Sequence, residues 1–184
     1  MSRKDFLAKQ LEETAKIIEW AIKLIPENRL IEIAPHKDHP KASEGMKRYF
    51  GLWPAYRLLF HLTFYEENYA LPTMKHYLGE PHPDVDIIFP KMEMEDAEFE
   101  KEVKKGINLQ LLIKRFHSVR KEQLEVLKKI KEEAWTEEKV KTGFGKVSLE
   151  FTTSKTIQHT LEHGDSILRN ALYWKRSLDW LNKQ

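Results

Sequence analysis

The stretch SKTIQHTLEHGDSILRNALYW, residues 154–174, decides the fold class because its apolar residues recur at spacings of three and four. That period places them on one face of an α-helix, and such a face must be buried against other elements. Apolar residues continue at helical spacing to about Leu181, and the hydroxyl of Ser154 can cap the first turn. The pattern therefore predicts a long helix from Ser154 to about Leu181.

Three other segments show the same helical period. They cover residues 6–25, 54–79 and 109–130, and Pro72 is expected to kink or end the second of them. Four long helices joined by crossover connections form a four-helix bundle, so we predict an all-α fold. No repeat, low-complexity tract or linker divides the chain, and we expect residues 1–184 to form a single domain.

The connecting segments are expected to be mostly irregular. Residues 34–51 are rich in proline, histidine and lysine, and residues 80–90 are a second proline-containing stretch, so both are predicted to be loops. A short charged helix is predicted from Met94 to Lys105, because a glycine then breaks the pattern. Residues 143–151 alternate between apolar and polar positions, which predicts a short arm or strand.

Composition restricts the functional classes. The chain has 184 residues with 31 Lys and Arg against 29 Asp and Glu, and the two signs are interleaved, which argues against a dedicated nucleic-acid surface. No apolar run approaches the roughly 18 residues of a membrane span. The charged start MSRKDFLAKQLEE does not resemble a signal peptide, so a cytoplasmic location is expected. The absence of cysteine leaves His, Asp and Glu as the strong metal ligands.

Three histidines form the candidate functional site. His159 and His163 are four residues apart, so both imidazoles project from one side of the predicted last helix, one turn apart. His61 occupies a second amphipathic helix, and a helical wheel places all three rings on the shoulder between core and solvent. Imidazole suits zinc, nickel, copper and iron, and three protein ligands leave positions open for water or substrate. The pattern predicts a mononuclear divalent-metal site; the alternative is two surface histidines and one buried, hydrogen-bonded histidine.

Residues on the same helix shoulders could line a pocket or support the ligands. Five of them are polar or aromatic: Arg57, Asn68, Ser166, Asn170 and Trp174. Such groups can orient a substrate or a bound water. Glu66 is open to three interpretations, as a partner of a metal ligand, a general base or an acid on the helix surface.

A family resemblance rests on these same residues. The run LLFHLTFYEENY, in which His61 stands five positions before Glu66, and the motif HTLEH almost a hundred residues later resemble the DinB/YfiT-like family of metal-dependent proteins. The resemblance covers most of the chain but not residues 81–105. It implies a four-helix bundle in which His61, His159 and His163 hold a metal, usually nickel or zinc, in a protein that is commonly a homodimer.

The resemblance also implies a type of reaction. Family members with known activity are thiol-dependent transferases or isomerases, which implies a small-molecule substrate and a low-molecular-weight thiol as cosubstrate. Two positions differ, because Thr160 stands where many relatives have glutamate and Ser166 where relatives often have glutamine. Two other functions stay open: a non-catalytic metal-binding dimeric bundle with a structural or stress-related role, and a metal-dependent hydrolase.

Overall fold

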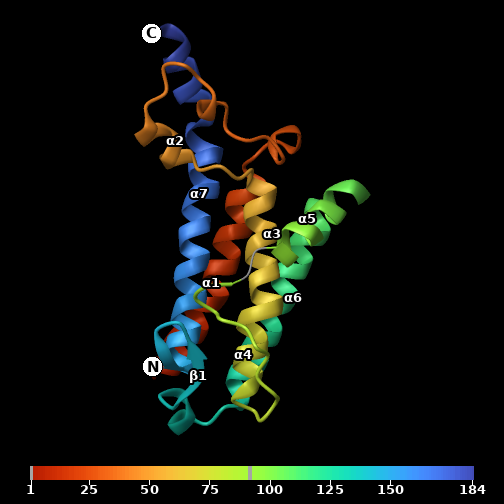
Figure 1. Cartoon of the computed structure of the whole chain (residues 1–184), viewed down its shortest axis with the longest axis vertical. Coiled ribbons are helices and arrows are strands. Elements are labelled where there is room, and N and C mark those ends of the chain that lie inside the picture. Colours follow the sequence, from red (N-terminus) through yellow and green to blue (C-terminus); the bar gives the residue numbers. More distant parts are fainter. Residues whose placement is uncertain (1, 91–92) are drawn as a thin grey trace.

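The computed structural model describes residues 2–90 and 93–184, and its helices form an all-α, four-helix bundle (Figure 1). The predicted fold class is therefore confirmed. The long segments of the bundle are α1 (Arg3–Lys23), α3 (Ala55–Tyr65) with its continuation, α6 (Leu109–Lys129) and α7 (Leu149–Lys183). α1, α6 and α7 bury one face in a common core, and α3 is buried on all sides within it.

The second helix of the bundle continues past Pro72. α3 passes through a π-helical turn, Glu66–Ala70, into α4, Leu71–His76. Pro72 lies in the first turn of α4, directly after the wider π turn, where a missing N–H and the proline ring are tolerated. Residues 55–76 therefore form one nearly continuous helical rod, and His61 lies on its first segment.

The last helix begins six residues earlier than the sequence predicts. Ser148, not Ser154, is its N-cap, and the Ser148 hydroxyl accepts a hydrogen bond from the backbone N–H of Phe151 at 3.1 Å. Thr152 and Thr153 continue the helix because each hydroxyl donates to a carbonyl four residues earlier, at 3.0 and 2.9 Å. The hydroxyls of these β-branched residues are thus hydrogen-bonded within the helix, although β-branched residues favour strands by propensity.

The helices α1 and α7 pack closely along the bundle. Gly164 permits this approach, because a Cβ at that position would lie 2.8 Å from the Cδ1 atom of Ile18. Several core side chains are fully buried: Leu11, Ala21, Ile22, Leu59, Leu62, Leu112, Leu149 and Ile167. The packing of α7 against α1 and α3 fixes the direction in which His159 and His163 project.

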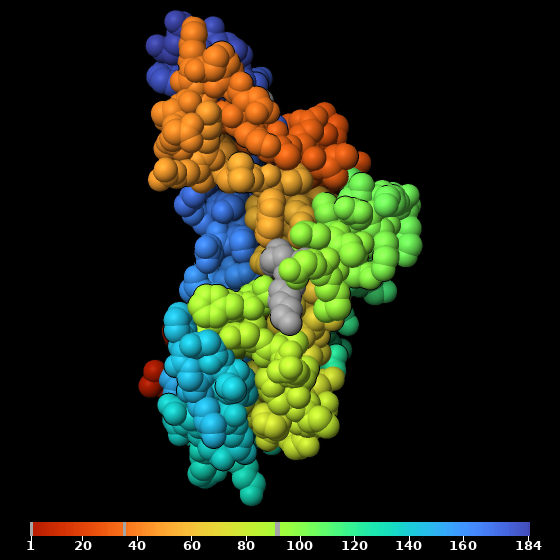
Figure 2. All heavy atoms as spheres, viewed as in Figure 1, coloured from red at the N-terminus to blue at the C-terminus, as the bar shows by residue number. Residues whose placement is uncertain are grey.

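The predicted loop at residues 34–51 contains a helix, so that prediction is wrong in part. α2 (Glu44–Phe50) begins at Ser43, whose hydroxyl accepts a hydrogen bond from the backbone N–H of Met46 at 3.2 Å. Phe50 packs with Ala34 and Trp174 in a small cluster apart from the main core. α2 and the C-terminal end of α7 project beyond the bundle (Figure 2), and we call residues 34–50 and 168–183 the terminal lobe.

Two short strands precede the last helix. β1 (Glu138–Thr142) and β2 (Gly145–Ser148) form an antiparallel hairpin in which Val140 pairs with Val147. Both valines are buried and join the main core. The strand predicted for residues 143–151 is therefore present, but it ends where α7 begins.

The short charged helix is confirmed as α5 (Glu93–Lys105), which crosses α3 on one side of the bundle (Figure 1). Among the described residues, no helix combines the length and the apolar composition that a membrane crossing requires.

Candidate metal centre

The three predicted histidines converge at one point between α3 and α7. The Nε2 atom of His159 lies 3.0 Å from Nε2 of His61 and 3.1 Å from Nε2 of His163. Ring nitrogens from all three side chains lie within 4.8 Å of one another. The convergence follows from the helical spacing, because His159 and His163 are one turn apart and both face α3.

The rings are more buried than their place on the helix shoulders predicts. His61 and His159 are only 5% and 8% exposed, and His163 is half-buried. The wheel considers each helix alone, whereas neighbouring aromatic side chains cover the rings. Trp53 lies 5.0 Å from the His61 ring, and Tyr65 lies 4.4 Å from the His159 ring. The site is consequently shielded from bulk water.

Burial keeps the α7 histidines neutral. Desolvation, together with the neighbouring His163 and His61 rings, lowers the pKa of His159 to about 2. Desolvation and His61 also lower the pKa of His163 to about 4. A neutral imidazole has a free lone pair on one nitrogen, which is the form that binds a metal ion.

The orientation of His61 is set by Glu95 on α5. The Nδ1 atom of His61 lies 2.9 and 3.0 Å from the two carboxylate oxygens of Glu95. A carboxylate accepts hydrogen bonds, so Nδ1 is the donor to Glu95, and Nε2 is the ring nitrogen that faces His159. Metal-binding histidines commonly have such a carboxylate partner on their second nitrogen.

Two of the three nitrogen separations fit a single divalent ion. Two nitrogens that each bind one ion at about 2.1 Å lie at most about 4.2 Å apart. The Nε2 separations of His159 from His61 and from His163, 3.0 and 3.1 Å, fall within that limit. The ligand set is entirely imidazole, which suits zinc, nickel, copper and iron. The three-histidine group could therefore hold a metal.

Glu66 belongs to a buried ion pair deeper in the bundle. It is 0% exposed, and its carboxylate accepts hydrogen bonds from Nε and Nη2 of Arg120, both at 2.5 Å. Burial raises the pKa of Glu66, and the guanidinium of Arg120 acts in the opposite direction. Arg120 also contacts the hydroxyl of Thr160 and donates to the carbonyl oxygen of Leu11 at 2.8 Å. Thr160, one of the two positions that differ from the family pattern, thus takes part in a buried polar network.

Of the other predicted neighbours, Arg57 lies beside the site. Its Nη1 atom is 2.5 Å from Glu95, the partner of His61. The side-chain donors of Asn68, Ser166 and Asn170 bond to backbone carbonyls four residues earlier in their own helices. Trp174 packs in the terminal lobe.

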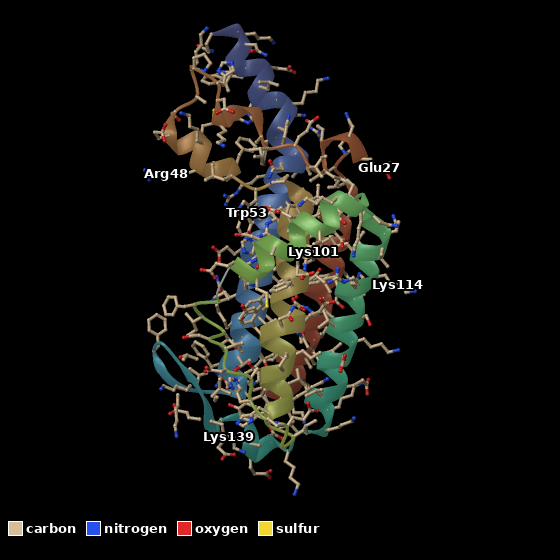
Figure 3. All side chains as sticks on the ribbon, turned by 45° about the vertical axis from the view of Figure 1, so that its right-hand side comes forward. Glu27, Arg48, Trp53, Lys101, Lys114 and Lys139 are labelled. Atoms are coloured by element: carbon tan, nitrogen blue, oxygen red, sulfur yellow. The ribbon has the colours of Figure 1, made fainter. Side chains whose placement is uncertain are left out.

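Sequence reasoning missed Glu95 and Trp53. Glu95 lies 34 residues from its partner, on a helix whose acidic residues are otherwise mostly exposed. Trp53 precedes α3, and Figure 3 shows it near the junction of the terminal lobe and the bundle. Neither residue belongs to an apolar stripe, so helical periodicity carries no signal for either.

A pocket of about 680 Å³ lies between the hairpin and the segment leading into α5. Tyr69 lines it and stacks on Tyr65, with 5.8 Å between ring centroids, and Tyr65 in turn contacts His159. Glu93 and Met94, which directly precede Glu95, line the same pocket. Tyr65 therefore connects His159 to Tyr69, a side chain of the pocket wall.

Comparison with models of protein families matches residues 10–167 to the DinB superfamily. The matched range includes all three histidines, Glu66 and Arg120. Neither a comparison with curated proteins nor one with solved structures gave a match. The family match covers most of the chain, and the protein therefore belongs to the DinB superfamily.

Proposed function

We propose that His61, His159 and His163 bind one divalent metal ion, nickel or zinc. The observation that carries this proposal is the approach of three Nε2 atoms, two of them 3.0 and 3.1 Å from the third, on rings that are buried or half-buried. Hydrogen-bonded histidines outside a metal site usually have a carbonyl or carboxylate partner, not two other imidazoles. A convergent all-imidazole set is typical of a metal site.

We further propose that the protein is a metal-dependent transferase or isomerase with a small thiol cosubstrate. A divalent ion with three protein ligands supplies Lewis acidity and lowers the pKa of a thiol or water. Trp53 and Tyr65 shield the rings from solvent, and the 680 Å³ pocket that Tyr69 lines offers space for a small molecule. The choice of a thiol, like the expected homodimer, is supported by the family resemblance.

The metal should stabilise the fold. Zinc or nickel at about 100 times its dissociation constant should add about 2.7 kcal/mol to the free energy of unfolding, because the unfolded chain lacks the assembled site. For a chain of this size that corresponds to roughly 5–10 °C in melting temperature. Differential scanning calorimetry with metal and with EDTA measures the difference. Equal melting temperatures at saturating metal would contradict a bridge between α3 and α7.

The activity requires a separate assay. We expect the metal-loaded protein to consume a small electrophile in the presence of a low-molecular-weight thiol. The reaction is monitored by the loss of free thiol or by mass spectrometry. His163→Ala and the chelated protein should show only the background rate. Turnover of esters or amides without a thiol would instead favour the hydrolase. Inactivity across a broad panel, with metal bound, would favour the non-catalytic bundle.

A further inference from the structure

The helix α5 is attached to the bundle in an unusual way. The one fully buried side chain of α5 is Glu95, which is 2% exposed, whereas helices normally dock through apolar side chains. Phe99 adds a half-buried contact, 5.2 Å from the ring of Phe60. The remainder of α5 is strongly charged, and Figure 3 shows it, marked by Lys101, crossing in front of α3. Glu95 is thus the one buried anchor of α5, supported by Phe99 and by Glu102, whose carboxylate accepts a hydrogen bond from the Tyr56 hydroxyl at 3.1 Å.

That carboxylate contacts a proposed metal ligand and a buried guanidinium. Glu95 accepts a hydrogen bond from Nδ1 of His61 at 2.9 Å and lies 2.5 Å from Nη1 of Arg57. Arg57 is 4% exposed, lies between the rings of Trp53 and Phe99, and also pairs with Asp96 at 2.6 Å. One guanidinium thus faces two carboxylates, of which the buried one, Glu95, lies against His61.

We propose that Glu95 is a positioning residue of the metal centre and that metal binding is thermodynamically linked to the docking of α5. This inference rests on the proposed metal site at the three histidines. An ion on Nε2 draws electron density from the His61 ring, which makes Nδ1–H a stronger donor to Glu95. Its positive charge also offsets the excess negative charge of the two carboxylates.

Thermodynamic linkage requires that metal binding and the docking of α5 favour each other equally. If docking of α5 increases the affinity for metal by a given factor, metal must favour the docked state by the same factor. Removing the partner of a metal-binding histidine typically lowers metal affinity about 10- to 100-fold. Metal should therefore favour the docked state of α5 by up to about 10- to 100-fold, which slows hydrogen exchange that occurs through local opening.

The test combines zinc affinity with hydrogen exchange on the full chain. Zinc dissociation constants are measured for wild type, Glu95→Ala, Glu95→Gln and the control Glu98→Ala. Glu98 lies on the same helix but is exposed and pairs only locally with Lys101. Glu95→Ala should bind zinc about 10- to 100-fold more weakly. Glu95→Gln, which keeps a hydrogen-bond acceptor, should lose less, and Glu98→Ala should match wild type.

Hydrogen exchange of the α5 amides is recorded with zinc and with EDTA. Wild type and Glu98→Ala should show slower exchange in α5 when zinc is bound, and Glu95→Ala should show little change at saturating zinc. Wild-type zinc affinity in Glu95→Ala, or unchanged α5 exchange in zinc-loaded wild type, would overturn the inference and leave the metal site intact. A wild-type protein that binds no zinc would overturn the metal site and this inference together.

Discussion

Replacing His159 with alanine should abolish stoichiometric metal binding. The Nε2 atom of His159 lies between those of the other two rings, at 3.0 and 3.1 Å, so its loss leaves His61 and His163 without their shared neighbour. Four-ligand zinc sites bind with about 10–16 kcal/mol, so each ligand contributes about 2.5–4 kcal/mol, or roughly 70- to 900-fold in affinity. Metal content after dialysis, measured by plasma mass spectrometry, should fall from about one ion per chain to near zero.

The matched control is His117→Ala. His117 is a histidine on another bundle helix, α6, and is half-buried, but its ring lies 2.6 Å from a carboxylate oxygen of Glu19, on α1. This variant should keep the metal content and affinity of the wild type. Retention of one tightly bound ion in His159→Ala would contradict the three-histidine site.

The largest loss of stability is expected from breaking the Glu66–Arg120 pair. Replacing Glu66 with alanine leaves the guanidinium of Arg120, which is 2% exposed, without its carboxylate partner inside the bundle. Removing one partner of a buried ion pair typically costs about 3–5 kcal/mol, because the remaining charge is uncompensated. Arg120, on α6, also contacts Leu11 on α1 and Thr160 on α7, and Glu66 lies on the continuation of α3, so the packing of all four bundle helices is affected. Unfolding in guanidinium chloride should show the loss.

The neighbouring residue provides the control. Glu67 pairs with Arg115 at 2.8 Å, but both side chains are about one-third exposed. Ion pairs in contact with water contribute about 0–1 kcal/mol, so Glu67→Ala should be nearly as stable as wild type. Equal, small effects at positions 66 and 67 would show that the buried pair is not a major source of stability.

Helical periodicity accounts for most of what could be predicted. The four long helices follow from apolar spacing, because each must bury one face in the shared core. Helical periodicity gave wrong helix boundaries where side-chain hydrogen bonds to the backbone outweigh the local propensity. The threonines after Ser148 are satisfied by carbonyls one turn earlier, so the helix begins before the predicted Ser154. In the predicted loop at residues 34–51, the capping hydroxyl of Ser43 initiates α2.

The prediction of the metal centre from the sequence was limited in a similar way. The spacing of His159 and His163 and the family resemblance predict which histidines meet, and the rings do converge. Their burial could not be predicted, because each ring is covered from outside its own helix: Trp53 and α5 cover His61, and Tyr65 of α3 covers His159 of α7. Glu66 was considered as a partner of a metal ligand, whereas Glu95 occupies that position beside His61. His61 and Glu95 are 34 residues apart on different helices, and helical periodicity in a single sequence does not indicate such a contact.

The uninterrupted length of α7 gives the molecule a mechanical property. The same helix carries His159 and His163 in the bundle and Trp174 in the terminal lobe, with no break between them. At about 1.5 Å per residue, Trp174 lies roughly 16 Å along the axis from His163. A tilt of about 5° at His163 would move that part of the lobe by roughly 1.4 Å. A small change in the direction of α7 at the histidines would therefore displace the terminal lobe, and the displacement would grow with distance along the helix.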